Sequence, residues 1–358
     1  MKIATSMKGF AVALLVVGAL LVAPSLYADS GANHQGPNPH FGVSGGNVND
    51  ITTRFCCSGT LGSLVESAGT QYILSNNHIL ARTDQAAVGE DVSQPGLIDN
   101  NCQTPPIVAD FTTASPLGSN VDAAIAELRA GAMDSTGYIE DIGTISTVVK
   151  APTVGLSVAK SGRTTGLTTG TIASVNTSVS VQYQKNCGSG KKFVVSYTNQ
   201  VVINSRTFSA GGDSGSLIVS NNKCHQPVAL LFAGSSSTTI GNPIGEVLSN
   251  LSGRLGSTVS FVGGSCSAAP TIESVNPQTQ EPSEASVARA MEVMRARENE
   301  LMQSPGIIGV GVGASDADPN EASIVVYIDA NAQIPASVPR RINGVRVKRV
   351  FTEPFRAY

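Results

Sequence analysis

The feature that most constrains the fold is a succession of short apolar or alternating segments between Thr60 and Phe261. Gly, Asn, Ser and Pro residues separate these segments, as they separate the strands of β-sandwiches and barrels. The 37 glycines, the absence of Trp and a charged fraction of 14% also fit a β-rich protein better than a helical or disordered one. We therefore predict an all-β domain with one short helix at Gly245–Leu251. The segments are Gly59–Val65, Gln71–Leu74, Val121–Leu128, Thr168–Val181, Phe193–Ile203, Ser216–Val219 and Val228–Phe232.

The N-terminal segment has the pattern of an export signal. Lys2 and Lys8 flank the start of an apolar run, Phe10–Ala23, and small residues follow up to Ala28. The run is short for a membrane span and no second hydrophobic stretch follows, so we predict a signal peptide over 1–28 rather than a retained anchor. The mature protein would then be secreted or periplasmic.

Composition divides the rest of the chain. Residues 29–50 are expected to form an irregular lead-in to a main domain at 51–266, and the Ser-, Pro- and Gln-containing stretch 267–284 indicates a linker. Residues 285–358 indicate a small α+β domain, with a helix at Ser286–Met302 and strands at Gly306–Gly313, Ser323–Asp329 and Val345–Val350. The first of these strands is Gly-rich but lacks a Gly-Lys-Ser/Thr ending, which argues against a phosphate-binding loop.

Six cysteines follow the predicted signal peptide. An even number in an oxidising compartment predicts up to three disulfides, of undetermined pairing. A zinc site is the alternative, but no Cys-x-x-Cys pair occurs and two adjacent cysteines fit one ion poorly. The cysteines are Cys56, Cys57, Cys102, Cys187, Cys224 and Cys266.

The formal net charge of −3 would become −5 once the two lysines of the signal peptide are removed. Such weak acidity argues against nucleic acid as the main partner. Six basic residues near the end favour a solvated edge strand over a site for an acidic partner. They are Arg340, Arg341, Arg346, Lys348, Arg349 and Arg356.

The sharpest chemical signal is the Gly-Asp-Ser-Gly core within Ser209–Ser216. Peptide hydrolysis by a serine needs a base for the hydroxyl proton, a carboxylate to orient the base, and N–H donors for the developing oxyanion. The glycines permit a tight loop that points N–H groups inward. We predict Ser214 as the nucleophile and the N–H groups of Gly212 and Ser214 as the oxyanion hole; an ordinary Gly/Ser turn is the alternative.

His78 is the best-placed base, because it lies where an apolar strand runs into a polar turn. Two of the other histidines, His34 and His40, lie in the lead-in, and His225 follows Cys224 in a loop-like stretch. We therefore predict His78 as the general base.

Asp122 opens the otherwise apolar segment Asn120–Leu128. A carboxylate buried there is costly without hydrogen bonds, so a role in orienting His78 explains its presence. A surface acid at the start of a strand is the alternative, and Asp110 is a competing candidate.

In order and type, His78, Asp122 and Ser214 resemble the triad of chymotrypsin-like serine peptidases, and Lys160–Thr171 resembles the matching segment of their alpha-lytic-type bacterial branch. The resemblance covers roughly residues 55–262. It implies an all-β fold of two six-stranded antiparallel β-barrels with the site between them. It also implies polypeptide substrates and an acyl-enzyme mechanism with no cofactor or metal. Substrate would pair along the strand Phe232–Ser235 by β-augmentation.

The chain also departs from that family. Ile79 rather than cysteine follows the histidine, so the family's disulfide pattern does not transfer, and no Arg-Ile-Val-Gly-like activation site precedes the domain. Phe208 stands where an Asp would select Lys or Arg, and residues 228–240 contain no His that would select Glu. We expect selection of a small or apolar side chain. The predicted pocket comprises Phe208, Ser209, Phe232, Ala233 and Gly234.

Other functions stay open at this point. A catalytically silent or autoinhibited binding protein on the same fold is the main alternative, and self-cleavage within 267–284 is another. An α/β-hydrolase is disfavoured because Ser216 breaks the Gly-x-Ser-x-Gly pattern and no strand–helix alternation surrounds it. The C-terminal domain could be a pro-domain, a substrate-binding module or an assembly contact, and could touch the main domain.

Overall fold

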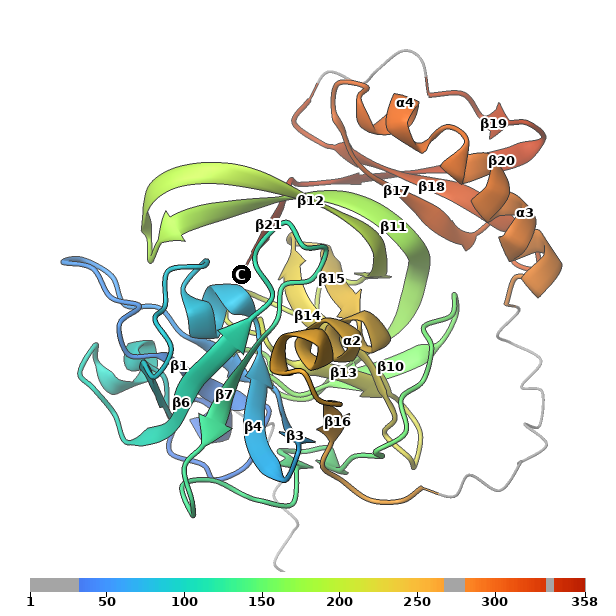
Figure 1. The fold of residues 1–358 in the computed structure, drawn as a ribbon. Coiled ribbons are helices and arrows are strands. Elements are labelled where there is room, and N and C mark those ends of the chain that lie inside the picture. The colour runs from blue at the N-terminus through green and yellow to red at the C-terminus, as the bar shows by residue number, and fades with distance from the viewer. Residues whose placement is uncertain (1–31, 267–280, 333–337, 358) are drawn as a thin grey trace, which may run out of the picture.

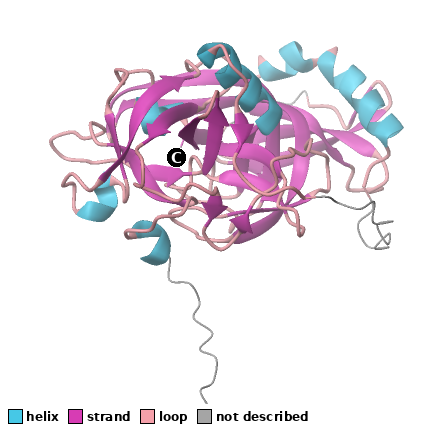
Figure 2. Ribbon diagram, turned by 60° about the horizontal axis from the view of Figure 1, so that its bottom comes forward, coloured by secondary structure: helices cyan, strands magenta, loops and turns pink. Residues whose placement is uncertain are grey.

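The computed structural model describes residues 32–266, 281–332 and 338–357. The predicted signal peptide and most of the predicted linker lie outside the described residues. Antiparallel sheet dominates the described part, with few helices (Figure 2). Within those ranges no helix is both long enough and apolar enough to cross a membrane.

The first barrel is an eight-stranded sheet in the order β16-β3-β4-β7-β6-β5-β1-β2. Only Gly62 separates β2 from β3, so the two form one bent strand. If they are counted as one and the edge strand β16 is left out, six strands form a closed ring. Leu64, Ile73 and Ile125 are fully buried inside it. The strands are β1 (Val43–Asn47), β2 (Gly59–Leu61), β3 (Ser63–Ser67), β4 (Thr70–Ser75), β5 (Asp91–Ser93), β6 (Ile107–Ala114), β7 (Ala124–Leu128) and β16 (Ser260–Phe261).

Strand β1 lies in the stretch that we expected to be irregular, and it pairs with β2 and β5. The glycines that suggest a loop serve close packing instead. A Cβ at Gly45 would lie 2.4 Å from the side chain of Leu61. The first barrel therefore includes residues that precede position 51.

The second barrel closes on itself in the order β10-β13-β14-β15-β12-β11, with β11 pairing back to β10. Val158, Phe208 and Val228 are buried in its core. Together the two barrels confirm the predicted all-β, two-barrel fold. The strands are β10 (Ser157–Lys160), β11 (Thr168–Asn186), β12 (Ser189–Asn204), β13 (Leu217–Ser220), β14 (Pro227–Gly234) and β15 (Thr238–Pro243).

The short helix predicted near Gly245 is confirmed as α2 (Ile244–Leu255). Its apolar residues Ile244, Val247 and Leu251 are buried in a cluster that contains side chains of both barrels, so α2 packs across the junction between them. The remaining short elements are α1 (Ala32–Gln35), η1 (Asn77–Ala81), η2 (Leu97–Asn100), β8 (Tyr138–Ile139) and β9 (Gly143–Thr144).

The C-terminal part has the three predicted strands, but the single helix predicted at Ser286–Met302 is two helices, interrupted at Ala296 and Arg297. One core cluster, which includes Ala290, Met294 and Val310, lies within this part, whereas Val325 and Tyr327 are buried in a cluster shared with the second barrel. Its strand β17 pairs antiparallel with β11, so the second sheet continues out of its barrel (Figure 1). The elements are α3 (Glu284–Arg295), α4 (Glu298–Met302), β17 (Ile307–Ala314), β18 (Ala322–Asp329), β19 (Arg341–Ile342), β20 (Val345–Thr352) and β21 (Phe355–Ala357).

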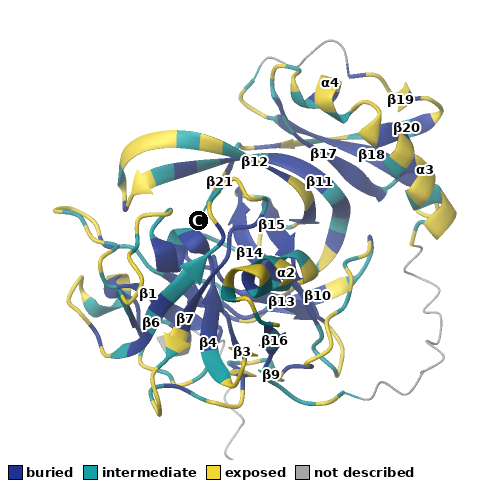
Figure 3. Cartoon of the chain, viewed as in Figure 1, coloured by how far each residue is buried: buried dark blue, intermediate teal, exposed yellow. Residues whose placement is uncertain are grey.

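One side of the long strand β11 is covered by three partners in succession. Residues Thr168–Thr171 pair with β10, Ser174–Val179 with β17, and Val181 and Gln182 with β21. Strand β21 thus leaves the C-terminal part and returns to the second barrel. Burial is deepest in the barrel interiors, whereas the outer face of the β11–β12 hairpin and of α3 is exposed (Figure 3).

Three disulfides are present, as predicted: Cys56–Cys102, Cys57–Cys187 and Cys224–Cys266. Cys187 lies in the turn between β11 and β12, and Cys57 lies just before β2. The Cys57–Cys187 bond therefore joins the first barrel to the tip of a hairpin from the second.

Candidate active site

The structure brings His78 and Asp122 together between the barrels. His78 lies in η1, directly after β4, and Asp122 precedes β7. The Nδ1 atom of His78 lies 2.7 Å from Oδ2 of Asp122, and the backbone N–H of His78 donates to Oδ1 at 3.3 Å. The Asp122 side chain is fully buried and that of His78 is 7% exposed. A buried carboxylate with these donors fixes both the orientation and the Nδ1–H tautomer of the imidazole.

A tyrosine from the second barrel completes the hydrogen bonding of Asp122. The hydroxyl of Tyr183, on β11, donates to Oδ2 of Asp122 at 2.8 Å and also contacts the hydroxyl of Tyr197 at 2.7 Å. Burial, with the nearby Asp122 carboxylate, raises the pKa of Tyr183 well above its ordinary value, so it stays a neutral donor. No pattern in the sequence singles out Tyr183, because a tyrosine is ordinary in an alternating strand.

Ser214 lies in the loop between β12 and β13, which packs directly on the first barrel. Its carbonyl accepts from the N–H of Thr60 at 2.8 Å. The bend at Gly62 makes room for this loop, since a Cβ at Gly62 would lie 1.9 Å from the carbonyl oxygen of Gly215. Ser214 is fully buried, and its hydroxyl donates to the carbonyl of Phe232 at 3.2 Å rather than to His78.

The backbone of this loop presents its amides as the sequence predicts. Gly212 has φ +98°, and among the described residues its N–H and that of Ser214 have no hydrogen-bond acceptor. A Cβ at Gly212 would lie 2.4 Å from Oγ1 of Thr164, so the loop requires glycine here. The two amides are therefore available to an added oxyanion.

The Asp213 carboxylate anchors the serine loop to the neighbouring Lys160–Thr171 segment. The backbone N–H groups of Thr164 and Thr165 donate to its carboxylate at 2.8 and 3.1 Å. Nζ of Lys160 lies 3.6 Å from the same carboxylate, and both side chains are fully buried. Burial lowers the pKa of Lys160 to about 8, against the opposing effect of Asp213. The Lys160–Thr171 segment thus holds the Gly-Asp-Ser-Gly loop in place.

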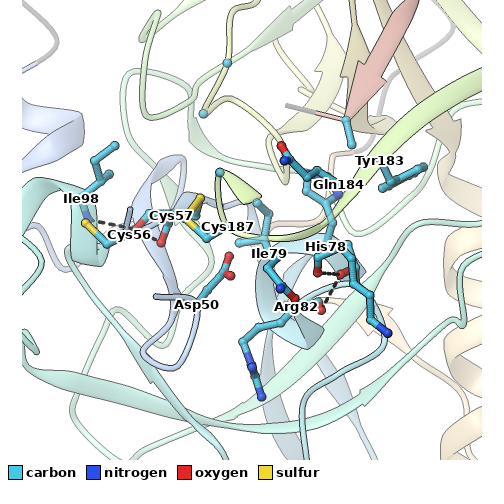
Figure 4. Close-up of a pocket in the computed structure, with 18 of the residues that line it drawn as sticks. Asp50, Cys56, Cys57, His78, Ile79, Arg82, Ile98, Tyr183, Gln184 and Cys187 are labelled. Carbon is cyan, nitrogen blue, oxygen red and sulfur yellow. Dashed lines mark hydrogen bonds between the residues drawn. A yellow bond between two sulfur atoms is a disulfide. The ribbon is translucent and has the colours of Figure 1, made fainter. Parts of the chain in front are cut away.

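A cavity of about 280 Å³ opens beside His78 (Figure 4). Asp50 lines it, and burial raises the pKa of Asp50 to about 6, although Arg82 and His78 oppose the shift. Gly212 and Ala357 also line it, so the cavity adjoins both the candidate oxyanion hole and strand β21. The sequence did not indicate Asp50 as a cleft residue.

The residues predicted for the specificity pocket do not line this cavity. Phe208 is fully buried in the core of the second barrel. Ser209 contacts Oγ1 of Thr239 at 2.5 Å, and Phe232 packs on the ring of Tyr197. Ala233 and Gly234 belong to β14 and pair with both β15 and β21. Their part in specificity stays a prediction.

The competing candidates make other contacts. Asp110 accepts two hydrogen bonds from Arg129, at 2.9 and 2.6 Å, and its pKa is lowered chiefly by them. His34 is buried against the carbonyl of Gly42, and His40 contacts Glu140 at 2.8 Å. The structure therefore groups Asp122, and not Asp110, with His78.

Comparisons with known proteins give one family model and several solved structures. The model, described as the Nal1 C-terminal domain, matches residues 119–242. A search of curated proteins found no match.

Three similar solved structures are serine proteases by their descriptions. The first is a glutamic acid specific serine protease that uses a histidine triad in substrate binding; it is 23% identical at a TM-score of 0.43, over 61% of this chain and 98% of that one. Thermobifida fusca Protease A is 19% identical at a TM-score of 0.42, over 63% of this chain and 100% of that one. Cellulomonas bogoriensis chymotrypsin is 17% identical at a TM-score of 0.42, over 63% of this chain and 100% of that one. The two barrels and their strand pairing define the chain as a protein of the chymotrypsin-like, or trypsin, fold.

Proposed function

We propose that the protein is an exported serine endopeptidase in which His78, Asp122 and Ser214 form the catalytic triad. The observation that carries the proposal is the buried 2.7 Å contact between Asp122 and His78, next to a glycine-flanked serine loop. The three disulfides fit an oxidising compartment, in line with the predicted signal peptide.

In this mechanism Asp122 holds the Nδ1–H tautomer, so Nε2 of His78 accepts the proton of Ser214. The hydroxyl first leaves the carbonyl of Phe232 by rotation about Cα–Cβ. Its oxygen then attacks the peptide carbonyl carbon, and the resulting oxyanion accepts hydrogen bonds from the N–H groups of Gly212 and Ser214. His78 returns the proton to the leaving amine, which departs and leaves an acyl-enzyme. Water, deprotonated by the same imidazole, hydrolyses that ester and restores Ser214.

The buried Lys160–Asp213 pair supports the proposal from the opposite side of the loop. A cation already within the chain neutralises Asp213 and holds the loop beneath Gly212 and Ser214. The loop therefore does not need the new N-terminal ammonium group that cleavage of a precursor would create. This is consistent with the absence of a trypsin-style activation site from the sequence.

The first test is covalent labelling with a fluorophosphonate, which reacts with an activated serine. The purified protein should be labelled at Ser214, and Ser214→Ala and His78→Ala should each abolish labelling. His225→Ala is the matched control and should label normally, with all variants melting like the parent protein. Labelling that survives Ser214→Ala would contradict the assignment of the nucleophile.

A catalytically silent binding protein is the second candidate. It is favoured by one observation, the hydrogen bond from the Ser214 hydroxyl to the carbonyl of Phe232 instead of to His78. That protein would fold and bind peptide but neither react with a fluorophosphonate nor cleave peptides.

A further inference from the structure

Strand β21 occupies the position that the proposed function gives to substrate. It pairs antiparallel with β14, with Ala357 opposite Ala233 and Arg356 opposite Gly234. On its other side it pairs parallel with β11, with Phe355 opposite Val181 and Arg356 opposite Gln182. The segment is thus an extended chain held between two strands, beside the carbonyl of Phe232 that accepts from Ser214.

The side chains of β21 fill two different sites. Phe355 is 1% exposed and lies in an apolar cluster with Val181 and Tyr183. Its ring centroid lies 5.9 Å from that of Tyr327, which belongs to β18 of the C-terminal part. Two residues later, Ala357 faces the cavity that His78 and Gly212 also line. Arg356, between them, is exposed.

We propose that β21 is a tethered ligand of the peptide site: it imitates substrate and blocks the site while it is docked. This inference rests on the proposed function. The substrates it implies are extended segments with a bulky apolar residue two positions before a small one, since Phe355 and Ala357 occupy those sites. The C-terminal part has two roles in this scheme, because Tyr327 helps to build the apolar subsite and β20 carries the tether.

The connection to the rest of the molecule suits a tethered ligand. Only Glu353 and Pro354 separate β21 from β20, and the hydroxyl of Thr352 lies 2.6 Å from that of Ser235. A short tether gives its ligand an effective concentration in the millimolar range. Free peptide at micromolar concentration therefore competes poorly until β21 is displaced. Because β21 pairs with β14 on one side and with β11 on the other, a substrate segment in its place must have both of its backbone edges free. This requirement favours loops and unfolded chains over strands that are already paired in a folded sheet.

The first test weakens the anchor of β21. Phe355→Ala should raise kcat/KM at least tenfold for a fluorogenic peptide that carries Phe two positions before Ala, and should raise the rate of fluorophosphonate labelling. Phe351→Ala is the control, because Phe351 precedes β21 by a few residues and is 51% exposed; its kinetics should match those of the parent. Replacing the Phe of the peptide by Gly should lower kcat/KM at least tenfold in the Phe355→Ala protein.

The second test locks β21 in place without touching β14. Gln182→Cys with Arg356→Cys puts two thiols at paired positions of β11 and β21. The oxidised double variant should cleave peptide at least tenfold more slowly than either single variant, and mild reductant should restore the rate. This lock remains informative if Phe355→Ala fails to fold.

The outcomes separate the two proposals. Equal labelling and equal kcat/KM in the parent, the Phe355→Ala protein and the oxidised lock would make β21 a plain structural strand, and would overturn this inference while leaving the peptidase assignment intact. A folded Phe355→Ala protein that neither labels nor cleaves would refute the peptidase assignment, and the inference with it. Equal cleavage of the Phe and Gly peptides would overturn the substrate class.

Discussion

At the scale of single residues, burial decides what the charged groups between the barrels can do. Asp122 is fully buried and accepts from the ring and the backbone of His78 and from Tyr183. The sequence could predict Asp122 and His78 because each is a polar residue in or at the end of an apolar segment. It could not predict Tyr183, whose separation of 61 residues from Asp122 is bridged only by the packing of one barrel on the other.

Tyr183→Phe should lower kcat/KM about tenfold, since hydrogen bonds to charged groups are worth roughly 1.5–3 kcal/mol. Without this donor the Asp122 carboxylate is oriented less firmly toward His78, so the loss should fall on kcat and not on KM. Tyr138→Phe, at an exposed tyrosine, is the control and should leave both constants unchanged. A loss confined to KM in Tyr183→Phe would argue against positioning through Asp122.

Asp50 makes stability depend on pH. Its pKa is raised to about 6, chiefly by burial, so the folded protein holds the proton more tightly than the unfolded chain. The contribution of this group to stability is therefore greatest below about pH 4 and falls as the pH rises through about 6. Asp50→Asn should remove this dependence and stabilise the protein by up to about 3 kcal/mol at pH 8, since each pKa unit corresponds to about 1.4 kcal/mol. Urea unfolding of both proteins between pH 4 and pH 8 checks the sign: curves that stay parallel over this range would contradict it.

At the scale of elements, close contact between strands depends on glycines that look like loop residues in the sequence. Apolar or alternating patterns predicted β2, β3, β4 and β7 in the first barrel and β11 to β14 in the second, because a half-buried strand shows its period directly, but they did not give β5, β6, β10 or β15. They missed β1, whose Gly45 and Gly46 carry no side chain to show that period. The sequence pattern also did not predict the bend at Gly62, which joins β2 to β3 and makes room for the Ser214 loop.

Gly62→Ala should therefore damage both stability and activity. The new Cβ would lie 1.9 Å from the carbonyl oxygen of Gly215, so either the strand or the serine loop must shift. We expect a loss of at least about 2 kcal/mol in unfolding free energy, with a fall in fluorophosphonate labelling. Gly253→Ala is the control, since nothing lies within 4 Å of its Cβ and it sits inside helix α2. That change should stabilise by about 0.5–1 kcal/mol.

At the scale of the whole molecule, the barrels and the C-terminal part are joined more closely than their separate sequence patterns suggest. A helical segment and three strands after residue 284 were predictable, because each has its own period. The pairing of β17 with β11 was not, since it depends on which edge of a distant sheet is left open. The disulfide from Cys57 to Cys187 was likewise beyond prediction, because six cysteines allow fifteen pairings.

The Cys57–Cys187 disulfide closes a longer loop than the Cys224–Cys266 disulfide does. The sequence separation is 130 residues for Cys57–Cys187 and 42 for Cys224–Cys266. By loop-closure entropy, Cys57→Ser with Cys187→Ser should cost about 5 kcal/mol, and Cys224→Ser with Cys266→Ser about 4 kcal/mol. Denaturant titration of the two double variants would reveal the order, and a greater loss from the shorter loop would show that strain or native contacts outweigh chain entropy.

The continuous cover on β11 has a consequence for how the protein behaves when it is cut or shortened. Three partners hide one side of this strand, and two of them, β17 and β21, belong to the C-terminal part. A chain that ends after the second barrel would present the backbone amides and carbonyls of Ser174–Gln182 to solvent as a bare edge. Bare edges of this kind recruit strands from neighbouring molecules. Preparations of such a fragment should therefore become turbid with concentration where the intact chain stays clear.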